Sequence, residues 1–473
     1  MKFLQDPIIL TLAILLALTV ILLIQSRRWA GVWLLAFTII LFVLPRAGIL
    51  VSHMSLPLPL AHVLAVLLIL QWLLWGPKQY RPQTRFGYYF LIYAAIAGFG
   101  AALGMSTGGD HTMALLELFI YLVSMGLFFY ASETFSERQH FILFAKLILC
   151  FSFLISIYGI AQKSMGSSIL VDHVTYNSAT DVARSYIDLG GAGAAQRRVL
   201  SSYGDPNVLA CQLLVFCGIA LALIVGRGIS AGVRLLCLGI LIVNIWCVYY
   251  TGSRAGIIVL VVVGLIVLSW RTRWFLLALP ALVLLIYIFG YNLLEEVLFT
   301  KLQALNYSDD LRAQFPAMTW QLLKKIPLGC GLGNMVTIDV ENFQLGFAVT
   351  PASNVWSGFN SFWLNLLSRL GIPGLVGFMI LLVIMFRYLW NQTRKIDNPL
   401  VRAIIIGGLA GCVGQTLIWL VNNTYMLPGG SLNFWFMMGM MVAGSRAFAT
   451  ETVPYMLPVQ RTWPVGQPVS FPT

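Results

Sequence analysis

The sequence predicts an all-α, polytopic integral membrane protein, and three observations lead to this fold class. Hydrophobic residues make up 59% of the 473 positions and charged residues only 10%, whereas a soluble domain carries about 25% charged residues. Runs of about 20 apolar residues, each long enough to cross a bilayer as a helix, recur along the whole chain. These runs are continuously apolar and do not alternate with polar residues, which excludes a β-barrel.

Thirteen apolar segments are expected to form membrane helices, because a segment in lipid must satisfy its own backbone hydrogen bonds. The eleventh is interrupted near Gly371 and Pro373. We expect one transmembrane domain over residues 1–447 and a disordered, proline-containing cytoplasmic tail over 448–473. The approximate ranges are 7–25, 30–45, 57–75, 87–105, 112–131, 141–162, 206–226, 235–251, 255–270, 274–292, 361–386, 400–420 and 430–447.

The short loops predict the orientation of the helices. Lys and Arg gather in every second loop, which makes those loops cytoplasmic and accounts for much of the net charge of +12 without nucleic-acid binding. Two longer segments, about 163–205 and 293–360, then lie on the outer side, as does the N-terminus. The basic loop residues are Arg27, Arg28, Lys78, Arg81, Arg85, Arg138, Arg227, Arg234, Arg271, Arg273, Arg394 and Lys395.

Metal and cofactor sites are not indicated. Six of the seven cysteines lie inside apolar runs, and Cys330 alone lies in a candidate loop. The five histidines are scattered and show no ligand spacing. No nucleotide-binding glycine loop of the Walker type is present. We therefore expect no metal and no cofactor.

Arg254 is the first residue of chemical interest. It belongs to the sequence TGSRAG at 251–256, directly before an apolar segment. An arginine at a membrane edge commonly extends its charged end toward lipid headgroups. The alternative is anion binding, because Ser253, its neighbouring glycine and the first N–H groups of a helix form an anion-receptive end. A guanidinium adds a two-pronged contact suited to phosphate.

Further arginines on the outer side favour anion binding. The positive-inside tendency does not explain them, and ionisable residues that break the membrane pattern are functional candidates. Surface solvation and lipid contact are the alternative explanation, but three separate segments contribute. Together with Arg254, the arginines are Arg197 and Arg198 in the first outer segment and Arg312 in the second. Asp205 and Asn207 in the first segment and Asp309, Asp310 and Trp320 in the second accompany them.

The order of these motifs resembles that of the O-antigen ligase and polysaccharide polymerase family. TGSRAG at 251–256 resembles the family's signature, and residues 198–207 resemble its Arg…Gly…Pro-Asn segment. Arg312, followed by PLGCGLGN at 327–334, resembles its Arg…Trp…Pro-x-Gly-x-Gly stretch. NSFWLNLLSRLGIPG at 360–374 resembles its His-Asn-x-x-Leu…Gly-x-x-Gly segment. The motifs cover about residues 195–380.

The resemblance implies a GT-C-like glycosyltransferase with about 12–13 helices in a bacterial cytoplasmic membrane and an active site facing the periplasm. The implied substrates are an undecaprenyl-diphosphate-linked glycan donor and a glycan or lipid-linked acceptor. Membrane lipids, a chain-length regulator and a flippase are the further expected partners. We expect a polymerase that joins lipid-linked repeat units. The alternative is a ligase that moves a finished glycan onto a lipid A core.

The family pattern also implies roles for individual residues. Arg254 and Arg312 are expected to hold the diphosphate, and Arg198 to assist. Asn360 is expected to orient a sugar hydroxyl or the loop. Asn207, Ser253 and Trp320 complete the expected substrate-binding set.

One position departs from the family pattern. The ligases commonly carry His directly before the Asn, and here that residue is Phe359. Phenylalanine cannot accept a proton, which favours the polymerase and leaves the base unassigned. Asp310 and Asp205 are the expected candidates, with Asp309 and His173 as other acceptors on the outer side. Asp205 before Pro206 can also shape a turn.

A membrane transporter is the alternative from a different functional class. Transporters place ionisable groups near the middle of the membrane, often on broken helices in paired halves. Here the notable charged residues gather at the outer edge, which favours the enzyme.

Overall fold

The computed structural model describes residues 48–49, 58–75, 84–135, 138–165, 198–203, 205–272, 320–321, 323–338, 347–351, 361–427 and 429–449. Predicted segments 7–25, 30–45 and 274–292 lie outside this part of the chain. So do residues 450–473 of the predicted tail and most of the two predicted outer loops.

Ten helices of 16 residues or more lie within the described residues, and each coincides with one of the predicted segments. Eight of them are long and apolar enough to cross a membrane, so the predicted all-α membrane fold is confirmed and the chain is a multi-pass membrane protein. Their bounds are α2 (Leu60–Trp75), α3 (Thr84–Ser106), α4 (His111–Thr134), α5 (Arg138–Met165), α8 (Pro206–Val225), α9 (Ala231–Tyr250), α10 (Arg254–Arg271), α14 (Phe362–Thr393), α15 (Pro399–Ile418) and α16 (Gly430–Ala447).

Polar residues beside the apolar segments set where several helices begin. Asp110 accepts a hydrogen bond from the backbone N–H of Met113 at the start of α4. Asn398 accepts from two backbone N–H groups at the start of α15 and is followed by Pro399. Such side chains satisfy N–H groups that have no partner within the helix, and proline fits the first turn because its missing N–H is not needed there.

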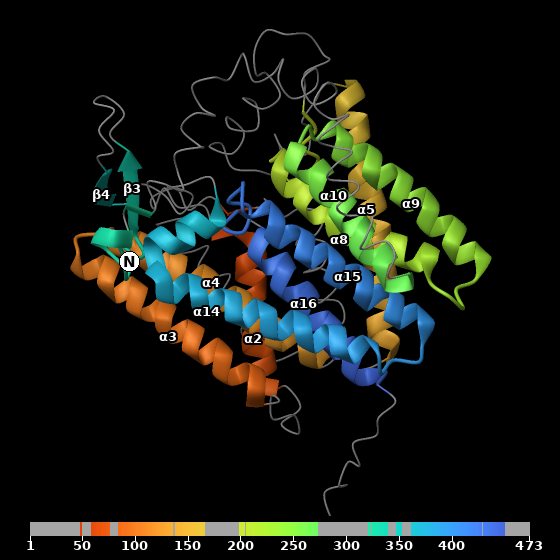
Figure 1. Ribbon diagram of the computed structural model, residues 1–473, viewed down its shortest axis with the longest axis horizontal. Coiled ribbons are helices and arrows are strands. Elements are labelled where there is room, and N and C mark those ends of the chain that lie inside the picture. Colours follow the sequence, from red (N-terminus) through yellow and green to blue (C-terminus); the bar gives the residue numbers. More distant parts are fainter. Residues whose placement is uncertain are drawn as a thin grey trace, which may run out of the picture.

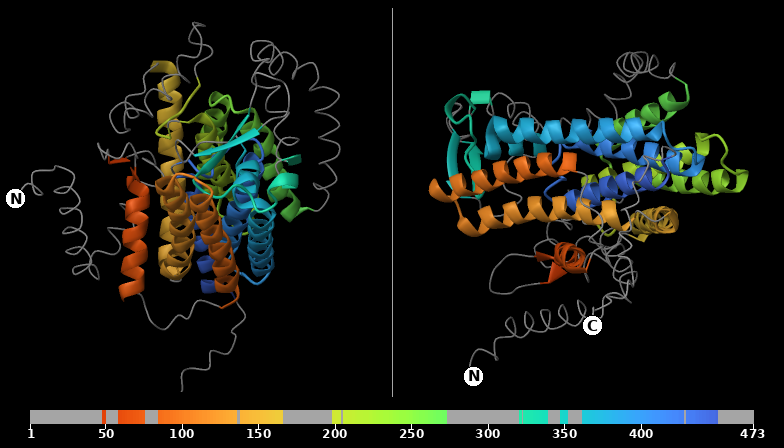
Figure 2. Two further views of the ribbon diagram at one scale, coloured as in Figure 1. Left: turned by 90° about the vertical axis from the view of Figure 1, so that its left-hand side faces the viewer. Right: turned by 90° about the horizontal axis from the view of Figure 1, so that it is seen from below.

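The helices form a bundle with two halves (Figure 1). In one half, α3 packs against α4 and α14, and α16 covers α4. In the other, α8 packs against α9, α10 and α15, and α5 lies along α9. The halves meet where α15 contacts α14 and α16, and α2 packs on the outside of α4, as the views in Figure 2 show.

Small residues allow α8 and α15 to pack closely at the centre of the second half. A Cβ atom at Gly407 would lie 2.3 Å from the carbonyl oxygen of Gly218, and one at Gly411 would lie 2.3 Å from the Cα of Val215. Gln415 of α15 donates to the carbonyl oxygen of Cys211 in α8. Close backbone approach and interhelical hydrogen bonds are what hold helices together in lipid, where apolar packing alone has little driving force.

Helix α14 is broken near its beginning, as predicted. Gly371 has φ 65° and ψ −162°, and Pro373 follows inside the helix. A proline in a helix interior removes a backbone hydrogen bond, and a positive φ suits glycine because it has no Cβ. The break therefore turns the first part of α14 away from the long second part.

Two short antiparallel hairpins are the elements that the helix pattern did not predict. β1 (Gly48–Ile49) pairs with β2 (Leu58–Pro59), and β3 (Asn334–Ile338) pairs with β4 (Phe347–Pro351). The second hairpin belongs to the long outer loop and stands at one end of the bundle (Figure 1).

The two ends of the bundle are distinguished by the arginines at one end and by the start of α8 and α10 at the other. At one end, Arg138 donates to the carbonyl oxygen of Ala447, Arg234 to that of Gly226 and Arg271 to that of Val225. These guanidinium groups satisfy carbonyls that end helices, where cations are favoured. Helices α8 and α10 begin at the other end, which we call the Arg254 end.

Candidate functional site

The segment that precedes α8 is anchored on the Arg254 end by backbone hydrogen bonds. The N–H of Val199 donates to the carbonyl oxygen of Tyr250, 3.0 Å away. The side-chain oxygen of Gln162 in α5 accepts from the N–H groups of Leu200 and Ser201 at 3.1 and 2.9 Å. The segment therefore lies in a fixed position between α5 and α9.

Arg198 begins this segment and lies across the turn between α9 and α10. Its Nε donates to the carbonyl oxygen of Thr251 at 2.8 Å, and its Nη2 donates to Oδ1 of Asn207 at 3.3 Å. A Cβ atom at Gly252, whose φ is 60°, would lie 3.5 Å from Nε of Arg198. The structure thus brings together residues of the first outer segment and of the TGSRAG motif.

Arg254 is the first residue of α10. Ser253 caps the helix, because its Oγ accepts from the backbone N–H of Gly256 at 3.2 Å. The Arg254 side chain is half-buried. Within the described part of the chain, its guanidinium forms no hydrogen bond, ion pair or ring contact. A partly buried cation that has no partner among the described residues is a candidate contact for a ligand anion.

Lys163 adds a third cation that sequence reasoning missed. Its Nζ lies 5.9 Å from the ring centroid of Tyr250, directly before the turn that Arg198 crosses. The predicted span ended at residue 162, so Lys163 was assigned to a loop without a role. The aromatic residue that it contacts is 87 positions away in the sequence, so no local pattern in the sequence signals this contact.

Asp205 has a structural role at the start of α8. One of its carboxylate oxygens accepts from the backbone N–H groups of Asn207 and Val208 at 2.7 and 3.1 Å. This is the turn-shaping alternative considered for Asp205, and it places a single negative charge near Arg198. Its role as a base stays a prediction.

The glycine segment, residues 326–334, is the second part of the site. It runs between α3 and the break in α14 and is held there by its backbone. Cys330 and Gly331 donate to the carbonyl oxygens of Ser368 and Arg369 at 2.8 and 2.9 Å, and Leu332 donates to that of Gly100 at 2.9 Å. The segment therefore connects two membrane helices.

Glycine is required at this crossing because the backbones touch. Gly329, Gly331 and Gly333 have φ of 83°, 84° and 80°, a region that other residues rarely adopt. A Cβ atom at Gly331 would lie 2.2 Å from the backbone nitrogen of Gly104. Asn334 closes the segment by donating from Nδ2 to the carbonyl oxygen of Cys330 at 2.7 Å. The glycines of PLGCGLGN thus serve close packing.

Cys330 is buried within this segment. Burial raises the pKa of its thiol to about 11. A thiol in this state carries little thiolate at neutral pH and is a poor nucleophile.

A buried ion pair lies next to the glycine segment. Arg369 of α14 donates through Nη1 to Oε1 of Glu117 in α4, and the two residues are 4% and 0% exposed. Glu117 also interacts with the backbone N–H of Gly333. Sequence reasoning missed both residues because each is a single charge inside an apolar run.

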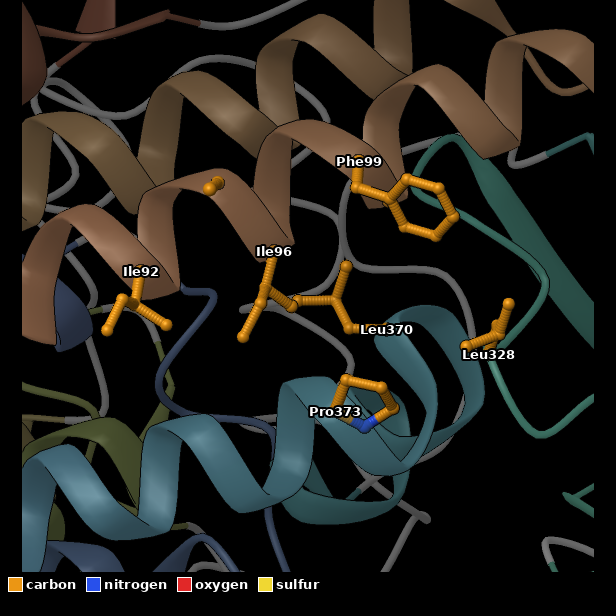
Figure 3. A pocket seen from close by; sticks show the side chains of 8 residues that line it. Ile92, Ile96, Phe99, Leu328, Leu370 and Pro373 are labelled. Atoms are coloured by element: carbon orange, nitrogen blue, oxygen red, sulfur yellow. The ribbon is translucent and has the colours of Figure 1, made fainter.

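An apolar pocket of about 370 Å³ lies beside the glycine segment. Figure 3 shows Ile92, Ile96 and Phe99 of α3 facing Leu370 and Pro373 of α14. Leu328 of the glycine segment completes this side of the pocket.

Trp320 lies at the surface and is 60% exposed, with Nζ of Lys324 5.7 Å from its ring. Among the described residues, no hydrogen bond or ring contact joins Trp320 to Arg198 or Arg254. The predicted site residues Arg312, Asp310 and Asn360 lie outside the described residues, so their predicted roles are untested.

Comparison with known proteins identifies one family. Residues 239–379 match the family model described as O-antigen ligase. The matched range includes Arg254, the glycine segment and the break in α14, whereas Arg198 lies before it. No curated protein matches the chain. Over residues 239–379, the chain is therefore similar to the O-antigen ligase family.

Proposed function

We propose that the protein is a polymerase that joins undecaprenyl-diphosphate-linked oligosaccharide repeats into a surface or exported polysaccharide. The reaction takes place at the outer face of the cytoplasmic membrane. The observation that carries this proposal is the half-buried side chain of Arg254, which has no partner among the described residues and directly follows the turn that Arg198 contacts.

The chemistry of the donor matches these groups. The acceptor hydroxyl attacks the anomeric carbon, the bond to the diphosphate oxygen breaks, and the electron pair leaves with the lipid diphosphate. Negative charge therefore develops on the leaving group, and positioned arginines stabilise that charge in a partly dehydrated site. Arg254 supplies a fork of donors that no described residue occupies, and the hydrogen bonds of Arg198 fix its own guanidinium against the turn before Arg254.

Residues of the outer loop complete the proposed site. Arg312 is the second diphosphate-binding arginine, Asn360 orients the acceptor sugar and Trp320 contacts the glycan. The proton of the attacking hydroxyl goes to Asp310 or Asp205, since Phe359 replaces the histidine of the ligases. Membrane helices flank the site and supply the apolar surface that the polyprenyl chain needs.

An O-antigen ligase is the second candidate, because the matched family model carries that description. The two functions differ in the acceptor. A deletion strain distinguishes them through its membrane lipid pool. Single repeats on the lipid carrier identify a polymerase, and long polymer on the carrier identifies a ligase. A normal lipid pool contradicts both candidates.

Substitution of Arg254 tests the proposed role directly. Removal of one donor to a developing oxyanion costs roughly 100- to 1,000-fold in rate. Arg254→Ala is therefore expected to lose nearly all polymer formation from purified lipid-linked repeats. Arg254→Lys is expected to lose most of it, because an ammonium group gives a point contact in place of a fork.

Arg271 provides the matched control, because it lies at the other end of the same helix and donates to the carbonyl oxygen of Val225. Arg271→Lys is expected to retain activity. If Arg254 only anchors the helix among lipid headgroups, lysine will replace it equally well. Near-normal turnover of Arg254→Lys with normal protein levels would therefore contradict the diphosphate assignment.

A further inference from the structure

The ion pair between Glu117 and Arg369 is unusual in its surroundings, because both residues are buried inside membrane-spanning helices. Buried charges in a membrane are costly and are retained mainly where they serve a function. A buried ion pair is also weak evidence for stability, since apolar residues of similar volume commonly stabilise a fold as well or better. The pair therefore needs an explanation beyond the stability of the bundle.

Both members of the pair contact the glycine segment. The backbone carbonyl oxygen of Arg369 accepts from the N–H of Gly331 at 2.9 Å. Glu117, on a different helix, interacts with the N–H of Gly333. The side chains of the two residues are hydrogen-bonded to each other beside these contacts. The ion pair thus joins α4 and α14 at the place where the glycine segment crosses between them.

The glycine segment in turn belongs to the long outer loop. Trp320 precedes it by six residues. At no more than about 3.6 Å per residue, the chain keeps Trp320 within about 22 Å of the anchored segment. A shift of the segment would therefore shift Trp320, which the proposed function places against the glycan.

We propose that Glu117 and Arg369 are a positioning pair that sets the outer loop on the bundle for transfer. This inference rests on the proposed function, because it assumes that the loop takes part in the reaction. The pair acts through the backbone of residues 329–333 and does not contact substrate. Loss of the pair is expected to release the glycine segment while α8, α9 and α10, which hold Arg198 and Arg254, stay in place.

Cys330 reports on the segment directly, since its thiol is buried and only 4% of the residue is exposed. The first measurement is the rate of Cys330 alkylation by a membrane-impermeant maleimide, read by peptide mass spectrometry. Glu117→Gln removes the charge and keeps the shape. A hydrogen bond to a charged group contributes enough that its loss should raise the alkylation rate on the order of 10- to 100-fold. Glu133→Gln, on the same helix, is the control and should leave the rate unchanged.

The second measurement separates positioning from a general structural role. The affinity for undecaprenyl diphosphate is measured with the purified protein in detergent. It should stay within about twofold, because the pair does not contact substrate; a tenfold change would correspond to about 1.4 kcal/mol. The turnover of lipid-linked repeats should fall, and by more than the affinity changes. The double variant Glu117→Arg and Arg369→Glu restores an ion pair, and it should recover part of the turnover and the slow alkylation.

The outcomes decide the inference. If Cys330 is alkylated equally fast in Glu117→Gln and in the control Glu133→Gln, the positioning role is overturned. It is also overturned if Glu117→Gln loses lipid affinity and turnover by the same factor. If Glu117→Gln does not accumulate in membranes, Arg369→Lys, which keeps the charge and loses the fork, takes its place. Faster alkylation of that variant supports the positioning role, and an unchanged rate refutes it. If the unsubstituted protein itself makes no polymer, faster alkylation of the variants would still support the anchoring of the glycine segment. That outcome would contradict only the proposed function.

Discussion

Replacement of Gly104 by alanine is expected to disrupt the crossing of α3 and the glycine segment. Gly104 lies in α3 and faces the backbone of Leu332. An ideal Cβ atom at this position would lie 1.7 Å from the carbonyl oxygen of Leu332. The obstacle is backbone, so no side chain can rotate away. Gly98, six residues earlier in the same helix, has no heavy atom within 4 Å of its Cβ position.

The two glycines give opposite expected effects on stability. Alanine in a helix interior is favoured over glycine by about 1 kcal/mol. At Gly104 the inserted methyl group forces a backbone shift that costs about 1–3 kcal/mol. The shift also weakens the hydrogen bond from Leu332 to Gly100, which contributes about 1 kcal/mol. The gain in helix propensity is common to both variants and cancels, so Gly104→Ala should be less stable than Gly98→Ala by about 2–4 kcal/mol.

Thermal unfolding of the two variants in the same detergent measures this difference, with polymer formation assayed in parallel. Gly104→Ala should unfold at a lower temperature than the unsubstituted protein and lose activity. Gly98→Ala should match or exceed the unsubstituted protein in both. Equal stability and activity of the two variants would refute the backbone contact between α3 and the glycine segment.

Three further predictions concern topology, thiol chemistry and the cap of α8. A cysteine at Ser308 should react with an impermeant reagent from outside and a cysteine at Thr393 should not; labelling of the latter would reverse the predicted orientation. Native Cys330 has a thiol pKa of about 11. Its thiolate fraction at pH 8 is roughly 200-fold below that of a free cysteine, so alkylation should stay slow until the pH approaches 11. Asp205→Asn keeps a side chain that can cap a helix, whereas Asp205→Ala loses about 1 kcal/mol of capping. Full activity of the Asn variant in an assay of polymer length would remove Asp205 as a base.

The helices could be predicted from the sequence because each depends on its own apolar run. Their starts also follow local rules, as with Asp110 and Asn398 before α4 and α15. The break in α14 was predicted from Gly371 and Pro373, since both residues act on their own backbone. The β3–β4 hairpin was not predicted, because it lies in a long outer loop without clear alternation.

The contacts between distant segments could not be predicted from local pattern. Glu117 and Arg369 are separated by 252 residues, and nothing in either apolar run indicates the partner. The glycines of PLGCGLGN suggested the family, but their spacing does not reveal that Gly331 crosses the backbone of Gly104. The meeting of Arg198 with the TGSRAG turn was expected only because the family pattern places both on the outer side.

The pairing of α4 with α16 has a consequence for how the protein is made. Ser124 of α4 donates to Ser431 of α16 at 2.9 Å, across 307 residues of chain. At about 5–20 residues per second, a ribosome needs roughly 15 to 60 seconds to synthesise that interval. During this time α4 is already in the membrane without the helix that covers its hydroxyl-bearing face. The nascent chain must therefore be protected from premature helix pairing or proteolysis until translation has passed residue 447, and a chain arrested before Gly430 should be a substrate for membrane quality control.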